Sequence, residues 1–144
     1  MITNSNQSMI KLKNVTKSDI HFLFELLEKR TSFENISHEK MPAFKNHEKF
    51  INSKPYFKWY IIYENSEKIG SIYLTNQDEI GIHFLDIKNH EKLFLKLLER
   101  MMKKHPRERF LININPKNKK SIRFFKNNGF KLIQYTFELS KIKN

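Results

Sequence analysis

Apolar residues recur along the chain with two periods, one typical of helices and the other of strands. Ile20, Leu23, Phe24 and Leu27 follow the i, i+3, i+4, i+7 spacing of a buried helix face, and Thr16 before them is a suitable N-cap residue. Apolar spacing and end signals predict three further helices, at about 44–52, 89–104 and 118–129. We therefore expect four helices along the sequence.

Extended runs with strand-like apolar patterns predict six strands. They are Ile10–Val15, Phe57–Glu64, Lys68–Thr75, Glu79–Leu85, Arg109–Ile114 and Phe130–Leu139. Short polar turns join the second, third and fourth strands, which predicts an antiparallel meander. The element order is β-α-α-β-β-β-α-β-α-β. It indicates one α/β (α+β) domain at 10–144, with a mixed, mostly antiparallel sheet flanked by helices, after a flexible tail at 1–9.

The composition is that of a folded intracellular protein. A chain of 144 residues with 39% apolar and 13% aromatic content is long enough for one sizeable core. The absence of Cys excludes disulfides, thiolate metal sites and cysteine nucleophiles. Apolar runs such as Trp59–Tyr63 are far shorter than a membrane span, and Met1–Met9 lacks the features of a secretion signal. We expect a cytoplasmic protein with no membrane partner.

The formal charge of +12 raises the alternative of a nucleic-acid partner. Only five of the 27 basic residues are Arg, and the basic residues are spread along the whole chain rather than grouped in one stripe. This distribution disfavours nucleic-acid binding. A positive field would still favour anionic small-molecule ligands.

The most informative segment is 115–130, where an Asn-Pro turn leads into a helix that Asn118 caps and Gly129 ends. Its residues match the pattern N-x-x-S-x-x-F-Y-x-x-x-G-F at Asn118, Ser121, Phe124, Phe125, Gly129 and Phe130. This pattern resembles the GNAT superfamily of N-acyltransferases, although Phe125 stands where Tyr is usual. The runs 68–74 and 79–82 resemble that family's central strands, so the resemblance covers about residues 10–139.

The resemblance implies acetyl-CoA as acyl donor. Its pantetheine arm would pair with the backbone of about His83–Ile87, and its pyrophosphate would lie at the start of the next helix. Lys92 and Phe94 occupy the two positions where the family has glycine, and Lys88 and Lys92 could supply charge instead. The alternative is an amphipathic helix that has lost its phosphate role. The coenzyme-binding residues that the resemblance implies are Phe84, Leu85, Ile87, Asn89, Lys92, Phe94, Asn118, Ser121 and Phe125.

The resemblance also implies residues for proton transfer. Glu79 is at the position of the family's general base, with a solvated carboxylate at the start of a strand as the alternative. Phe125 has no proton to give, and Tyr73 or Tyr135 could substitute as the acid that protonates the departing thiolate. A backbone N–H near Leu85 would polarise the thioester carbonyl.

The acceptor side would be built from the first two helices and the loop between them. Asn35, His38 and Trp59 are the implied substrate-binding residues; His38 could equally be a surface residue, and Trp59 a core residue. The six His residues show no metal-ligand spacing, so we expect no metal.

Together these features predict an N-acetyltransferase that acts on a small-molecule amine, such as an amino sugar, by direct attack. The alternative is a catalytically degenerate protein of the same fold that binds a ligand or a partner. A homodimer is left open.

Overall fold

A four-stranded antiparallel sheet forms the centre of the computed structural model, which describes residues 9–30, 41–86 and 90–141. Its strands lie in sequence order, and each pairs with the next in antiparallel fashion. They are β1 (Ile10–Asn14), β2 (Lys58–Glu64), β3 (Glu67–Leu74) and β4 (Ile80–Phe84). The predicted meander is confirmed, because β2, β3 and β4 follow one another through tight turns.

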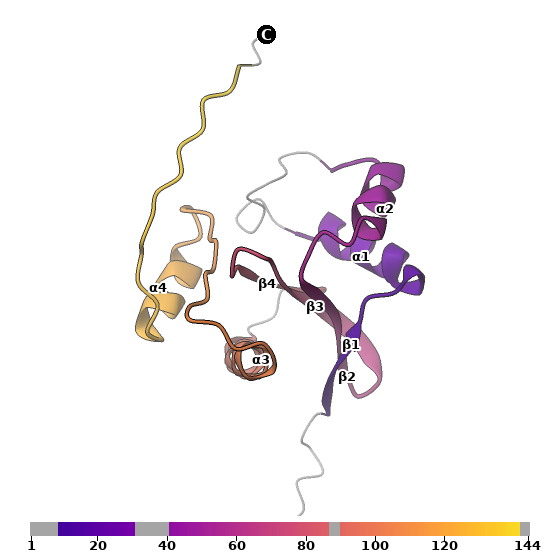
Figure 1. Ribbon diagram of the computed structural model, residues 1–144, viewed down its shortest axis with the longest axis horizontal. Helices are drawn as coiled ribbons and strands as arrows, with labels where there is room; N and C mark the ends of the chain where they lie inside the picture. Colours follow the sequence, from indigo (N-terminus) through magenta and orange to yellow (C-terminus); the bar gives the residue numbers. More distant parts are fainter. Residues whose placement is uncertain (1–8, 31–40, 87–89, 142–144) are drawn as a thin grey trace, which may run out of the picture.

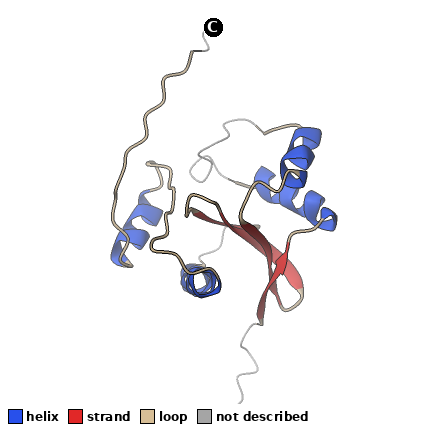
Figure 2. Cartoon of the chain, viewed as in Figure 1, coloured by secondary structure: helices blue, strands red, loops and turns tan. Residues whose placement is uncertain are grey.

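Helices cover both faces of this sheet (Figures 1 and 2). They are the short 3-10 helix η1 (Lys17–Asp19), α1 (Ile20–Glu28), α2 (Phe44–Asn52), α3 (Glu91–Lys104) and α4 (Lys119–Asn127). One face packs against α1 and α2 through Ile61, and the other packs against α3 and α4 through Ile62 and Ile72. All four predicted helices and the α+β class are thus confirmed.

Capping residues fix where the helices begin and end. The Asp19 carboxylate accepts from the Thr16 N–H at 2.8 Å and from Lys68 Nζ at 2.7 Å, so this buried group also joins η1 to β3. At the other end of the chain, the Asn118 side chain accepts from the Ser121 N–H at 3.2 Å and caps α4. Gly129 has φ +91°, a conformation that glycine adopts at low cost, and it ends that helix.

The last two predicted strands differ from the prediction. Residues 109–114 reach β4 at a single parallel bridge between Glu79 and Leu111, where the Ile80 N–H donates to Leu111 O at 2.8 Å. Residues 131–141 are extended and exposed, and they run away from the sheet (Figure 1). Alternation of apolar and polar residues indicates that a segment tends to be extended. To form a sheet, the segment also needs a neighbouring strand at about 4.7–4.9 Å. Neither segment has such a neighbour along its length in the described part of the chain, so the four-stranded sheet is antiparallel rather than mixed.

No helix among the described residues is both long and apolar enough to cross a membrane.

Candidate active site

One edge of β4 is paired and the other is open. On the paired side, the Leu85 N–H donates to Ile69 O at 2.8 Å and Thr75 N–H donates to Glu79 O at 2.9 Å. Because backbone groups alternate along a strand, the N–H groups of Ile82 and Phe84 face the opposite side. There they have no backbone hydrogen bond to any described residue, since the 109–114 segment meets β4 only at Leu111. We call the amides of Ile82 and Phe84 the open edge of β4.

The Leu85 amide is therefore not the one that could polarise a carbonyl here, because it is bonded to β3. The side chain of Leu85 packs on the α1 and α2 side, whereas Phe84 packs toward α3 and α4. The open edge has the geometry of an unpaired strand. It is suited to a ligand that carries amide groups of its own.

The first turn of α3 follows β4 and begins at Glu91, after His90. Its first N–H groups have no acceptor within the helix, which favours an anion, and the exposed Lys92 adds positive charge. Glu91 adds an opposing negative charge in the same turn. Phe94 does not point its ring away from the protein. Its N–H donates to His90 O at 2.7 Å, and its ring lies 5.4 Å from the Phe125 ring centroid.

Aromatic rings fill the space between β4, α3 and α4. Phe94 contacts Phe84, Phe124 and Phe125 in edge-to-face arrangements, and Phe125 also contacts Phe130. We call these five residues the phenylalanine cluster. Phe125 is buried, and Phe124 and Phe130 pack against the core. The cluster contains no hydroxyl group, so nothing in it replaces the proton that a tyrosine at 125 would carry.

Glu79 lies just before β4, and its carboxylate is fixed by two neighbours. Its Oε2 accepts from Asn113 Nδ2 at 2.9 Å and its Oε1 accepts from the Thr75 hydroxyl at 3.3 Å. Asn113 belongs to the segment that diverges from β4. The carboxylate is thus held where that segment departs from the sheet, close to the open edge.

Tyr73 and His83 lie on the same face of the sheet as Glu79. Tyr73 covers Gly81, where an added Cβ would lie 2.2 Å from the ring, and it stacks on Tyr56 with ring centroids 3.9 Å apart. Burial raises the pKa of both tyrosines, and the charge of Glu79 adds to the rise. Burial, with a smaller effect of the Arg30 charge, lowers the pKa of His83 to about 3. Tyr73 therefore stays protonated at neutral pH, and His83 stays neutral.

Trp59 borders this group from β2. Its ring lies 4.7 Å from Tyr56 and 6.5 Å from Tyr73, and its buried indole N–H has no hydrogen-bond partner among the residues described. An unpaired buried donor is costly unless a ligand or water satisfies it. Trp59 is thus packed in an aromatic group and also presents an unused donor.

Several predicted residues lie outside the described residues, namely Asn35, His38, Ile87 and Asn89. Conversely, Tyr56, His83, Asn113 and Arg30 were not identified from the sequence. Strand alternation from Glu79 to His83 could have indicated that these two share a face. The contacts of Tyr56 and Asn113 depend on segments far apart in the sequence, which no local pattern reveals.

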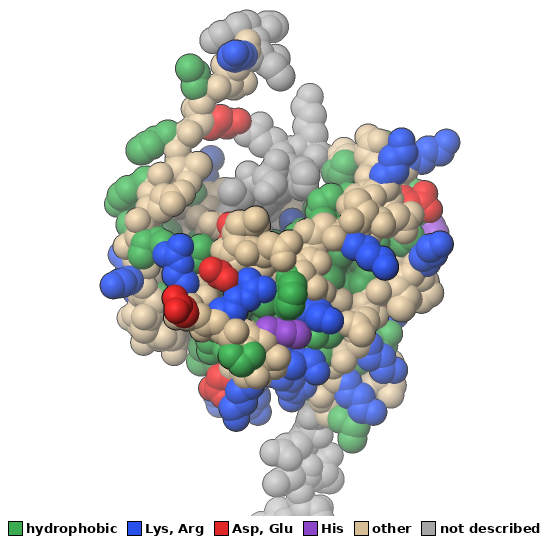
Figure 3. All heavy atoms as spheres, viewed as in Figure 1, with side chains coloured by type: hydrophobic (Ala, Val, Ile, Leu, Met, Phe, Trp, Pro, Cys, Tyr) green, Lys and Arg blue, Asp and Glu red, His purple; other side chains and the backbone are tan. Residues whose placement is uncertain are grey.

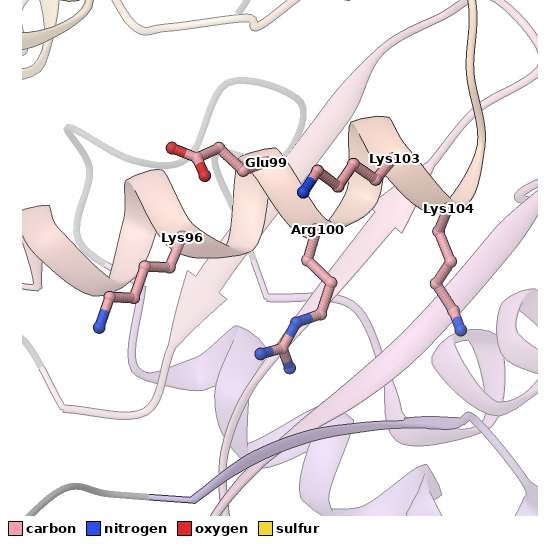
Figure 4. Close-up of a pocket in the computed structure, with 5 residues that line it drawn as sticks. All are labelled: Lys96, Glu99, Arg100, Lys103 and Lys104. Atoms are coloured by element: carbon pink, nitrogen blue, oxygen red, sulfur yellow. The ribbon is translucent and has the colours of Figure 1, made fainter.

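An open depression of about 470 Å³ lies elsewhere, along α3, where Arg100 donates to Ile10 O of β1 at 3.1 Å (Figure 4). Lys96, Arg100 and Lys104 form one stripe along the helix, and Glu99 and Lys103 line the depression with them. Basic residues in the last turn compensate the negative end of the helix dipole, which gives them a structural role. The depression is near the opposite end of α3 from the first turn. Within 9–30, 41–86 and 90–141, no group of three or more His, Asp or Glu side chains could hold a metal.

The fold is that of the GNAT acetyltransferases, as comparison with solved structures shows. The chain is similar to a domain from Methanocaldococcus jannaschii DSM 2661, with a TM-score of 0.73 and 21% identity over 92% of this chain and 94% of that one. It is similar to the dodecameric spermidine N-acetyltransferase of Vibrio cholerae, with a TM-score of 0.68 and 16% identity over 92% and 85% of the two chains. It is also similar to yncA, a putative acetyltransferase from Salmonella typhimurium solved with acetyl-CoA, with a TM-score of 0.64 and 16% identity over 85% and 80%. The sequence matches no protein-family model and no curated protein.

Proposed function

We propose that the protein is an N-acetyltransferase that transfers the acetyl group of acetyl-CoA to a small-molecule amine. The observation that carries the proposal is the open edge of β4, whose two amides face the side where the chain diverges from the sheet. Pantetheine contains two amide groups and can pair with such an edge as a strand would. The fold, shared with acetyltransferases, supports this use of the edge.

The residues present fit the pantetheine arm and the pyrophosphate of acetyl-CoA, but they lack the usual proton donor for the sulfur. The open edge suits the pantetheine arm, and the first turn of α3 with Lys92 suits the pyrophosphate. The phenylalanine cluster offers no proton donor where the sulfur would lie. Acetyl-CoA supplies an activated acyl group and a thiolate leaving group when bound.

Proton transfer is assigned to Glu79 and Tyr73. The amine nitrogen attacks the thioester carbonyl carbon, the C–S bond breaks, and the nitrogen loses a proton while the sulfur gains one. Glu79, held by Asn113 and Thr75, takes the proton from the amine, directly or through water. Tyr73 remains protonated at neutral pH because burial raises its pKa, so it can donate a hydrogen bond or a proton to the sulfur.

The acceptor is proposed to lie beside Trp59, Tyr56 and Tyr73. Aromatic rings attract an ammonium group, and the indole N–H is available for a polar substituent. The charges of Arg30 and Glu79 act with opposite signs on Tyr56 and Tyr73. We propose an amino sugar as the acceptor, because the indole N–H suits one of its several hydroxyl groups.

The test is acetyl-CoA-dependent thiol release with a panel of amines, together with acetyl-CoA binding by calorimetry. Glu79→Gln is expected to lower kcat/KM by about 10²–10⁴ while coenzyme affinity changes by only a few-fold. Glu99→Gln on α3 is the matched control and should retain full activity. No binding of acetyl-CoA at millimolar concentration would contradict the proposal.

A second candidate function rests on the phenylalanine cluster. Its rings take up the space between β4, α3 and α4, as expected of a degenerate member of the fold that binds a ligand or a partner without catalysis. Acetyl-CoA binding without thiol release from any amine in the panel would favour this candidate. Acetyl transfer by the wild type that is reduced in Glu79→Gln would exclude this non-catalytic candidate.

A further inference from the structure

The turn between β3 and β4 is built around Thr75, which is buried. Its hydroxyl oxygen accepts from the N–H groups of Gln77 and Glu79 at 3.1 Å each, and the hydroxyl donates to Glu79 Oε1 at 3.3 Å. A hydroxyl has one proton to donate and two lone pairs to accept with, so all three are used here. The position of the Glu79 carboxylate therefore depends on the position of Thr75.

Arg107 holds this turn from the segment that follows α3. Its Nη1 donates to Thr75 O and to Asp78 Oδ1, at 2.8 Å in both cases. Asp78 has φ +69°, a left-handed conformation that costs free energy for a residue with a Cβ, and the ion pair helps to keep it. The guanidinium also lies 4.8 Å from the centroid of the Phe57 ring, a cation–π contact that fixes its place.

Arg107 differs from the many basic residues at the surface. On the face of the molecule in Figure 3, numerous Lys and Arg side chains lie at the surface with only a few Asp and Glu among them. Exposed ion pairs of that kind contribute little to a structure. Only 18% of the Arg107 side chain is exposed, and both of its acceptors belong to the turn that ends at Glu79. Its contacts are therefore suited to fixing the geometry of that turn.

The segment that follows α3 holds both the turn and the carboxylate. Arg107 bonds the turn first, the Leu111 N–H then donates to Asp78 O at 2.8 Å, and Asn113 Nδ2 donates to Glu79 Oε2 at 2.9 Å. One donor thus reaches Glu79 from the turn and another from this segment. A movement of the segment relative to the turn would shift the carboxylate.

We propose that Arg107 is a positioning residue for Glu79, an inference that rests on the proposed function because that function makes Glu79 the base. Arg107 touches neither the amine nor acetyl-CoA, and it acts through the turn. The two hydrogen bonds to the Glu79 carboxylate leave about two of its four lone-pair sites for the amine proton or a water. The turn sets the direction of those sites. A displacement of about 1 Å in a reacting group costs on the order of 10²-fold in rate.

The experiment measures kcat and KM for the wild type, Arg107→Met, Glu79→Gln and the double variant, with an amine that the wild type acetylates. Arg107→Met removes both hydrogen bonds and should lower kcat about 10–100-fold, with KM changed by only a few-fold. The double variant should be no slower than Glu79→Gln, because Arg107 acts through that carboxylate. Arg107→Lys should recover most of the activity, since one nitrogen makes both bonds. Arg109→Met, at an exposed position of the same segment, is the matched control and should keep the wild-type kcat.

Two further measurements do not depend on a fully folded Arg107→Met enzyme or on turnover. Asp78→Asn removes the ion pair, retains a residue that tolerates the left-handed conformation, and should lower kcat by a smaller factor of a few-fold. Amide hydrogen exchange follows the turn directly. Exchange of the Glu79 N–H should become about tenfold faster in Arg107→Lys that is further changed to Arg107→Met, with a smaller change at Ile62 in the middle of β2.

The outcomes separate this inference from the proposed function. Full activity of Glu79→Gln would overturn the proposed base and the role of Arg107 with it. An impaired Glu79→Gln beside a wild-type kcat in both Arg107→Met and Asp78→Asn would overturn the role of Arg107 alone. A double variant slower than Glu79→Gln by the full factor of Arg107→Met would also overturn it, as would unchanged exchange at the Glu79 amide.

Discussion

His83 provides a quantitative test of the candidate site. Its side chain lies beside Tyr73 on the α1 and α2 side of β4, and burial followed by the Arg30 charge lowers its pKa to about 3. In the unfolded chain the same imidazole takes up a proton near its ordinary pKa of about 6.5. The unfolded state therefore binds more protons between about pH 3 and about pH 6.5. The stability that the neutral imidazole contributes is present above that window and is lost as the pH falls through it.

The magnitude follows from the two pKa values. Between about pH 7.5 and about pH 5, this single group should lower the free energy of unfolding by about 2 kcal/mol. Urea unfolding of the wild type and of His83→Gln at both pH values measures the effect. The variant should lose about 2 kcal/mol less than the wild type over this interval, because it has no proton to bind at this position.

His21→Gln is the matched control, since His21 is exposed on α1. Its pH dependence should match that of the wild type. Equal losses of stability in the wild type and in His83→Gln would contradict a lowered pKa of His83. They would mean that His83 takes up its proton in the folded protein about as readily as in the unfolded one.

Three further predictions concern packing and charge. Phe94→Ala should lower the free energy of unfolding by about 2 kcal/mol in urea denaturation, roughly half the cost of a fully buried ring, and Phe94→Leu should recover most of it. Because the Phe94 ring points inward, the affinity of Phe94→Ala for acetyl-CoA should stay within a few-fold; a tenfold gain would mean that the ring obstructs the coenzyme. Gly81→Ala should lower the free energy of unfolding by about 1–3 kcal/mol, because the Tyr73 ring must move to make room for the new methyl group. The near-ultraviolet circular dichroism spectrum should change with the ring, and an unchanged spectrum would contradict this packing. The hydrogen bond to Asp19 raises the pKa of Lys68. The pair therefore stabilises the folded state below about pH 10.5, and this stabilisation is lost as the pH rises through the raised pKa. In Asp19→Asn, unfolding free energies measured across that window should fall less steeply than in the wild type, and an equal slope would contradict the assignment.

Periodicity identified most of the fold because the corresponding elements are stabilised locally. The apolar stripes of α1 and α3, the Thr16 and Asp19 cap and the turn at Gly129 can be read over a few residues. The last two predicted strands could not be decided in this way. Strand pairing depends on which segment of backbone lies beside the strand in the folded protein. The sequence of 130–139 indicates only that one face of this segment is apolar.

The sequence resemblance predicted individual residues of the candidate site but not how they are arranged. Glu79 and Tyr73 were predicted as catalytic residues and remain a prediction; the structure places them on one face of the sheet. The direction of the Phe94 ring was not predictable, because it depends on how α3 packs against β4 and α4. The stacking of Tyr56 on Tyr73 joins a loop to a strand 17 positions later, which no periodic pattern indicates.

In the proposed function, the open edge of β4 accepts the pantetheine arm of acetyl-CoA. Amide hydrogen exchange at Ile82 and Phe84, measured with and without saturating acetyl-CoA, is the decisive experiment. Pairing with the ligand should slow exchange at both amides by about tenfold or more, with a smaller effect at Ile62 in the middle of β2. Unchanged exchange at Ile82 and Phe84 under conditions where acetyl-CoA is bound would mean that the pantetheine arm does not pair with this edge.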